Sequence, residues 1–211
     1  MSKIILGGGG DDKVAYESHK YFYESLGSEK KVLYIPVAMD PAKHPWASCM
    51  DWFYSGFKVF GEVSVNLLTE FNGLTNDFLS QYDGIYVGGG NTFKLLKVFK
   101  DSGFDQLLRN YIENGGIYYG GSAGAIIMGK TIDTATAFDP NDVALKDLTG
   151  LNFIDGFSIW PHYDSNHEQM MIDWNKANGK VIGIGEDSAF VVNGKELENI
   201  GDNLLKLEDG N

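Results

Sequence analysis

The sequence predicts a doubly wound α/β fold: a single, mostly parallel sheet with helices on both faces and an antiparallel C-terminal edge. Strand-like apolar runs alternate with helix-like segments, which is typical of parallel sheets covered on both faces. The run at 32–37 is continuously apolar, as in strands buried on both sides. The last apolar runs follow one another without a helix between them, and this indicates the antiparallel edge.

The first half of the chain repeats strand, loop and helix. A strand over 3–6 ends at four glycines, 7–10, and the helix expected over 14–26 begins after an aspartate and ends at Gly27. The next expected strands are 32–37, 63–68, 84–87 and 117–119. The next expected helices are 46–60, one opened by Asn91, and 104–113.

The second half is less regular. Residues 131–150 are loop-like, 157–160 is strand-like, and 165–176 is expected to be helical. Strands are expected at 181–184, 189–192 and 204–207. Asn193-Gly194 is a hairpin signal, which we place between the last two strands.

Length and charge narrow the class of protein. We expect one domain over residues 1–211, and 43% hydrophobic residues are enough for a core. The net charge of -12 disfavours nucleic acid and anionic membranes as partners. Cys49 is the single cysteine, and no leader or membrane-spanning run is visible, so we expect a cytoplasmic protein. A homodimer is compatible with these features.

A serine flanked by small residues follows the strand expected at 117–119. In Gly120-Gly121-Ser122-Ala123-Gly124, the small neighbours would allow the strained strand-to-helix turn that exposes a nucleophile. The Ala123 amide would point toward the same place and suit an oxyanion. Glycine-rich turns of this kind also bind phosphates or permit close packing, so the motif needs support from other residues.

Ser122 needs a general base, and the chain has four histidines. His19 and His44 fall in or near expected helices, and we expect His167 to be exposed. His162 follows the strand expected at 157–160, and ligand sites gather at the C-terminal ends of parallel strands. We therefore expect His162 to face Ser122, although a buried structural histidine is the alternative.

A carboxylate should orient the imidazole of such a pair. Glu186 is the first choice, because it follows the strand expected at 181–184. Asp187, Asp139 and Asp164 compete for this role, since the chain has 29 acidic residues.

A second glycine cluster, Gly88-Gly89-Gly90, follows the strand expected at 84–87. It lacks the lysine of a phosphate-binding loop, and the glycines at 7–10 lack the spacing of a dinucleotide motif. A backbone amide of Gly89 or Gly90 would add a second oxyanion donor. For 7–10 we favour close packing of the loop.

Together these motifs resemble the peptidase E and cyanophycinase family of serine peptidases, whose fold is like that of class I glutamine amidotransferases. The similarity covers nearly the whole chain and includes residues 86–93, 121–125, Pro161-His162 and 184–187. The resemblance implies Ser122 as nucleophile, His162 as base and an oxyanion hole at Gly89 or Gly90 and Ala123. Relatives differ in the third residue, and the absence of a carboxylate over 134–137 favours Glu186.

The resemblance also suggests a substrate. Peptidase E cleaves dipeptides with an N-terminal aspartate, which requires a cation in the site, but Arg109 is the only arginine and lies before the nucleophile turn. We expect a serine peptidase acting on small peptides, with Asp-X dipeptides left open and no metal or organic cofactor. A glutaminase is disfavoured, because Cys49 is not at the turn. A catalytically silent binding protein is the other alternative.

Overall fold

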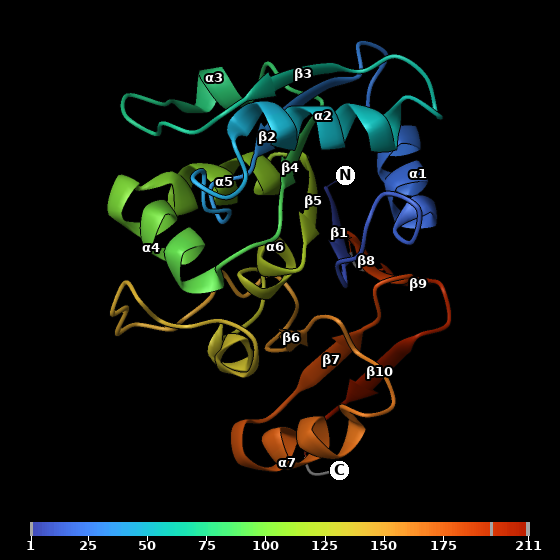
Figure 1. Ribbon diagram of the computed structural model, residues 1–211, viewed down its shortest axis with the longest axis vertical. Coiled ribbons are helices and arrows are strands. Elements are labelled where there is room, and N and C mark those ends of the chain that lie inside the picture. The colour runs from blue at the N-terminus through green and yellow to red at the C-terminus, as the bar shows by residue number, and fades with distance from the viewer. Residues whose placement is uncertain (1, 195, 210–211) are drawn as a thin grey trace.

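The computed structural model describes residues 2–194 and 196–209 and confirms the α/β fold (Figure 1). Seven strands form the main sheet in the order β3-β2-β4-β5-β1-β8-β9. Their bounds are β1 Lys3–Gly7, β2 Lys31–Ile35, β3 Ser64–Leu67, β4 Gly84–Val87, β5 Ile117–Gly121, β8 Ala189–Asn193 and β9 Glu196–Ile200. The first five run parallel, whereas β8 and β9 are antiparallel and form the expected edge.

Helices cover both faces of the main sheet. On one face lie α1 (Tyr16–Ser25) and α2 (Trp46–Phe57), and on the other lie α4 (Thr92–Ser102), α5 (Phe104–Glu113) and the short α6 (Ala123–Ile126) (Figure 1). None of the helices in the described part of the chain is both long and apolar enough to cross a bilayer.

The two faces follow from the alternation of side chains along each strand. One face receives the tyrosines of three neighbouring strands, Tyr34, Tyr86 and Tyr119, and the other receives Leu33, Ile85 and Tyr118. All six side chains are buried, so these strands appear as continuous apolar runs in the sequence.

The structure adds a second, smaller sheet whose strands we had expected in the main one. β6 (Ser158–Trp160) pairs in parallel with β7 (Val181–Ile184), and β10 (Leu204–Leu207) pairs with β7 antiparallel. Helix α7 (Glu168–Asn178) packs on this sheet through Met171, beside Trp160 and Val181 (Figure 1). An apolar run identifies a strand but not its partner, because pairing depends on residues far away in the chain.

The hairpin turn lies at the residues that we expected, but it connects a different pair of strands. The turn at Asn193-Gly194 leads from β8 into β9, whereas we had expected the strand at 204–207. β9 is missing from the sequence prediction because it is an outer strand with mostly exposed residues and no apolar run.

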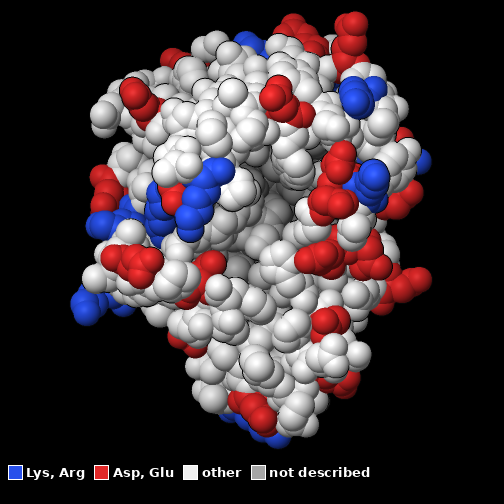
Figure 2. Space-filling view, viewed as in Figure 1, with Lys and Arg blue, Asp and Glu red and all other residues white. Residues whose placement is uncertain are grey.

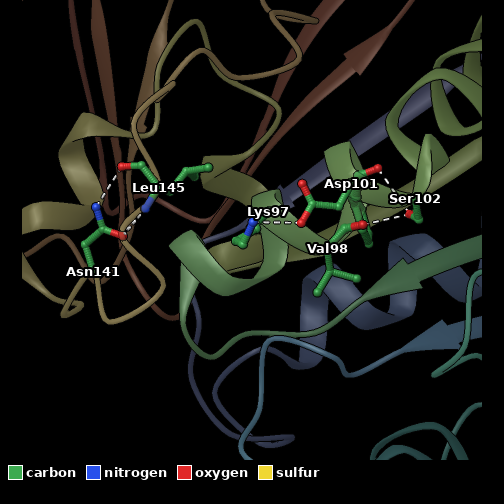
Figure 3. A network of polar contacts seen from close by, with 7 residues as sticks. Lys97, Val98, Asp101, Ser102, Asn141 and Leu145 are labelled. Carbon is green, nitrogen blue, oxygen red and sulfur yellow. Dashed lines mark hydrogen bonds and ion pairs between the residues drawn. The ribbon is translucent and has the colours of Figure 1, made fainter.

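Two further short elements were not predicted from the sequence. One is α3 (Asn76–Leu79), and the other is a 3-10 turn, η1 (Asp133–Ala137), which lies inside the expected loop 131–150. The rest of this loop lacks regular structure but is ordered by side chains. Asn141 Nδ2 donates to the Leu145 carbonyl at 2.9 Å, and Asn141 Oδ1 accepts from the Leu145 amide at 2.9 Å (Figure 3). The same view shows the Lys97–Asp101 ion pair of α4, at 2.8 Å.

Candidate active site

Ser122 occupies a strained turn between β5 and α6. Its φ of 49° and ψ of −108° are unusual for a residue other than glycine. The turn is compact because a methyl group on Gly120 would lie 2.3 Å from the Gly124 carbonyl oxygen, and one on Gly124 would lie 2.5 Å from that of Val87. Packing therefore requires glycine at positions 120 and 124.

His162 lies directly beside Ser122. The distance from Ser122 Oγ to His162 Nε2 is 2.9 Å, and that from His162 Nδ1 to Glu186 Oε1 is 2.8 Å. A carboxylate accepts only, so Nδ1–H donates to Glu186, and Nε2 is left to accept the serine proton. The structure thus brings the three expected residues into one hydrogen-bonded line.

The three side chains come from both sheets. Ser122 follows β5 of the main sheet, whereas His162 follows β6 and Glu186 follows β7 of the small sheet. Side-chain exposure is 37% for His162 and 51% for Glu186, so the carboxylate end of the line faces solvent.

The end of β1 and the loop that follows it contact both Ser122 and His162. The Gly7 carbonyl accepts the Ser122 amide at 3.0 Å, and the Gly8 carbonyl accepts the His162 amide at 2.9 Å. Gly9 has a φ of 121°, and a methyl group there would lie 2.3 Å from His162 Cε1. The glycines at 7–10 thus allow the close packing of the loop that we favoured, and the loop packs against His162. The run of glycines in the sequence does not by itself indicate this contact with His162.

The competing carboxylates are used elsewhere. Asp139 Oδ2 accepts from the amide and hydroxyl of Thr92, at 2.9 and 2.7 Å, and so caps α4. Asp164 accepts from the Asn166 amide, and Asp187 accepts from the Ser188 hydroxyl. Glu186 is the candidate that contacts His162.

The other histidines lie outside the line. His167 is half-buried rather than exposed and pairs with Asp164 at 3.3 Å. His44 is exposed and precedes α2. His19 is buried on α1, with Nε2 3.0 Å from the Tyr86 hydroxyl, and burial lowers the pKa of His19 to about 4.

The expected oxyanion donors lie at different distances from the serine. A methyl group on Gly89 would lie 3.2 Å from Ser122 Cβ, whereas one on Gly90 would meet the backbone of Ala38 at 2.5 Å. Ala123 is the first residue of α6, whose initial amides have no intrahelical acceptor. Gly89 and Ala123 therefore flank Ser122, and Gly90 packs on the neighbouring loop.

A cavity of about 530 Å³ opens at Ser122 and His162. It reaches from the 88–90 loop to α2, and glycine backbone lines it together with the aromatic side chains of Tyr34, Trp52, Tyr86 and Tyr119. Figure 2 shows this face of the molecule hollowed near its centre, with basic side chains on one side of the hollow and acidic ones on the other.

Arg109 and Cys49 are not part of the hydrogen-bonded line of Ser122, His162 and Glu186. Arg109 donates to the Leu151 carbonyl, pairs with Glu113 at 3.6 Å, and does not line the cavity. Cys49 lines the cavity from α2 rather than the turn after β5. Among the described residues, no group of three His, Cys, Asp or Glu side chains is arranged to hold a metal ion.

Comparison with known proteins identifies relatives over most of the chain. Residues 4–200 match the model of peptidase family S51. An uncharacterized peptidase of Pasteurella multocida is 37% identical over 123 residues, which span 56% of this chain and 59% of that protein. An uncharacterized peptidase of Bacillus subtilis, YgaJ, is 31% identical over 177 residues, or 80% of this chain and 72% of the relative.

A solved structure shares the fold. The crystal structure of a putative peptidase E protein from Listeria monocytogenes superposes with a TM-score of 0.77 and 28% identity. The superposition covers 95% of this chain and 98% of the other.

Proposed function

Because the chain belongs to peptidase family S51, a family of serine-type peptidases, we propose that it hydrolyses small peptides with Ser122 as nucleophile. His162 is the proposed general base and Glu186 the residue that orients it. The observation that carries this proposal is the continuous line of contacts, 2.9 Å from Ser122 Oγ to His162 Nε2 and 2.8 Å from His162 Nδ1 to Glu186 Oε1.

The first half-reaction forms an acyl-enzyme. His162 Nε2 takes the hydroxyl proton as Ser122 Oγ attacks the peptide carbonyl, and Glu186 stabilises the imidazolium. The amides of Gly89 and Ala123 are the proposed donors to the oxyanion. His162 then gives its proton to the leaving amine, and the C–N bond breaks.

The second half-reaction releases the acyl group. A water molecule loses its proton to His162 and attacks the ester carbonyl, and Ser122 leaves with a proton from His162. The strained turn at Ser122 supports this cycle, because it holds the hydroxyl clear of the sheet where both the acyl carbon and His162 can reach it.

The size of the cavity supports a small substrate. Pockets for small ligands typically measure about 300 to 1,000 Å³. At about 530 Å³, the cavity beside Ser122 fits one or two amino-acid residues better than a folded protein chain. We therefore propose dipeptides and similarly short peptides.

A fluorophosphonate probe tests the nucleophile without assuming a substrate. We expect it to label Ser122 in the wild type and to leave Ser122→Ala unlabelled, because only an activated serine reacts readily. His162→Ala should also label poorly. The same extent of labelling in the wild type and His162→Ala would contradict the proposed base, and no labelling of a folded wild type would favour a catalytically silent binding protein.

A further inference from the structure

The lining of the cavity bears on which peptides are cleaved. We infer that the residue on the acyl side of the scissile bond carries a neutral apolar or aromatic side chain rather than a carboxylate. This inference rests on the proposed function, because it takes Ser122 as the atom that attacks the peptide carbonyl.

Three tyrosines form one wall of the cavity. Tyr34, Tyr86 and Tyr119 are register partners on the adjacent strands β2, β4 and β5. The rings of Tyr86 and Tyr119 stack with centroids 4.5 Å apart, and those of Tyr34 and Tyr86 meet edge to face at 5.5 Å. The neighbouring strands thus place a continuous aromatic surface beside the nucleophile.

Helix α2 and the loop before it complete the enclosure. Trp52 meets Tyr86 edge to face at 6.2 Å, and Cys49 and Met39 line the same space. Burial raises the pKa of the Cys49 thiol, so this group is neutral near neutral pH. These side chains provide apolar and polarizable contacts but no positive charge.

Neither His19 nor Lys94 places a positive charge in the cavity. No lysine or arginine of the described residues lines the cavity. His19 does, but its pKa of about 4 keeps it neutral at neutral pH. Lys94, which follows the 88–90 loop, donates its ammonium to the Met39 carbonyl at 2.6 Å. His44 is exposed and adds a polar group at the edge.

The positions of Gly89 and His162 assign this space to the acyl group. His162 must protonate the leaving amine, so the leaving group lies toward His162 and Gly9. Gly89 lies against Ser122, and the aromatic wall continues from its loop, since a methyl group on Gly88 would lie 3.5 Å from the Tyr34 hydroxyl. The acyl residue, which is bonded to Ser122, therefore extends over the tyrosines.

An aspartate side chain in this space would lose hydration without gaining a cation. The uncompensated burial of a carboxylate is costly, so we expect Asp to be cleaved on the order of 100-fold less efficiently than the isosteric Asn. Leu, Met and Phe should be better than both, because they bury apolar surface against the aromatic wall.

The experiment is a set of X-Leu dipeptides with X as Asp, Asn, Leu, Met or Phe, measured as kcat/KM. The leaving residue is constant, and the Asp and Asn pair isolates the charge. We expect Phe, Leu and Met to be cleaved best and Asp worst. Cleavage of Asp-Leu equal to or better than that of Asn-Leu would overturn the inference, as would cleavage of none of the five by an enzyme whose Ser122 reacts with fluorophosphonate.

A designed cation sharpens the test. Ser48 is exposed at the cavity edge, so Ser48→Arg should add a guanidinium without disturbing the core, and Ser48→Gln is its neutral control. We expect Ser48→Arg, unlike Ser48→Gln, to raise kcat/KM for Asp-Leu about tenfold relative to Asn-Leu. If Lys94→Met instead abolished a wild-type preference for Asp-Leu, Lys94 would be the missing cation and the inference would fail.

The outcomes separate this inference from the proposed function. Failure of Ser122 to react with fluorophosphonate counts against the nucleophile and hence against both proposals. Labelling of Ser122 together with a preference for Asp-Leu leaves the serine peptidase standing and overturns only the neutral acyl site.

Discussion

The main sheet and the small sheet contribute to the site in different ways. The main sheet presents Ser122 and Ala123 within one short motif, on a backbone held by close packing of glycines. The small sheet presents His162 and Glu186 singly, each after a different strand, with side chains partly open to solvent. Ser122 is thus positioned by local geometry, whereas His162 and Glu186 are positioned by the packing of one sheet against the other.

Two consecutive residues at the end of β1 connect the Ser122 turn to His162. Adjacent carbonyls of Gly7 and Gly8 receive the amides of Ser122 and His162, at 3.0 and 2.9 Å. A change in this loop should therefore alter the distance between Ser122 and His162 more than it alters either sheet.

The largest effect is expected on the main-sheet side. Ser122→Ala should reduce kcat by on the order of a million-fold, because it removes the proposed nucleophile of a set of residues that act together. The thermal unfolding temperature should stay close to that of the wild type, which circular dichroism can check. Retention of peptide hydrolysis in purified Ser122→Ala would contradict the role of Ser122 as nucleophile.

On the small-sheet side, Glu186→Gln should reduce kcat on the order of 1,000-fold, since a neutral amide stabilises the imidazolium poorly. The matched control is Asp139→Asn, because Asp139 caps α4 through Thr92 and does not contact His162. It should keep near wild-type kcat while lowering stability. Equal losses of kcat in the two variants would contradict the role of Glu186.

The connection between the Ser122 turn and His162 is tested by Gly9→Ala. A methyl group there would lie 2.3 Å from His162 Cε1, so the imidazole must move, and a displacement of about 1 Å can cost on the order of 100-fold in kcat.

Gly73→Ala is the matched control for this change. Gly73 also has positive φ, 73°, but no atom within 4 Å of an added methyl group. Gly73→Ala should lose about 1 to 2 kcal/mol of stability from backbone strain alone. Gly9→Ala should lose more, because its methyl group also meets His162, and only Gly9→Ala should lose kcat. A similar loss of kcat in Gly73→Ala would mean that general destabilisation, not the position of His162, is being measured.

The smallest effect concerns the buried main-sheet face. The pKa of His19 is lowered from 6.5 to about 4, so the unfolded chain binds a proton that the folded chain does not. Stability from this group is present above pH 6.5 and is lost as pH falls toward 4. From about pH 7 to about pH 5, the wild type should lose about 2 kcal/mol more than His19→Gln.

Denaturant unfolding at the two pH values measures this difference, with His44→Gln as an exposed control. A wild type and His19→Gln with the same pH dependence would show that His19 is not held neutral by burial.

Local sequence determined the parts of the protein whose geometry is local. The apolar runs of the parallel strands, the serine between small residues and the glycine loop after β4 can be recognised within a few residues, because packing or backbone strain demands those residue types there. The choice of His162 and Glu186 as candidates followed from their positions just after apolar runs, where sheet edges carry polar groups.

Only the tertiary structure decided how those parts meet. The division of strands into two sheets, the pairing of β8 with β9, and the contact of Glu186 rather than Asp139 with His162 all depend on residues far apart in the chain. The aromatic wall beside Ser122 also depends on residues far apart in the chain. Each tyrosine belongs to an ordinary buried strand, and only the register of β2, β4 and β5 places Tyr34, Tyr86 and Tyr119 in one row. Periodicity determines which face a side chain occupies, but the neighbour it meets there is set by the pairing of whole strands.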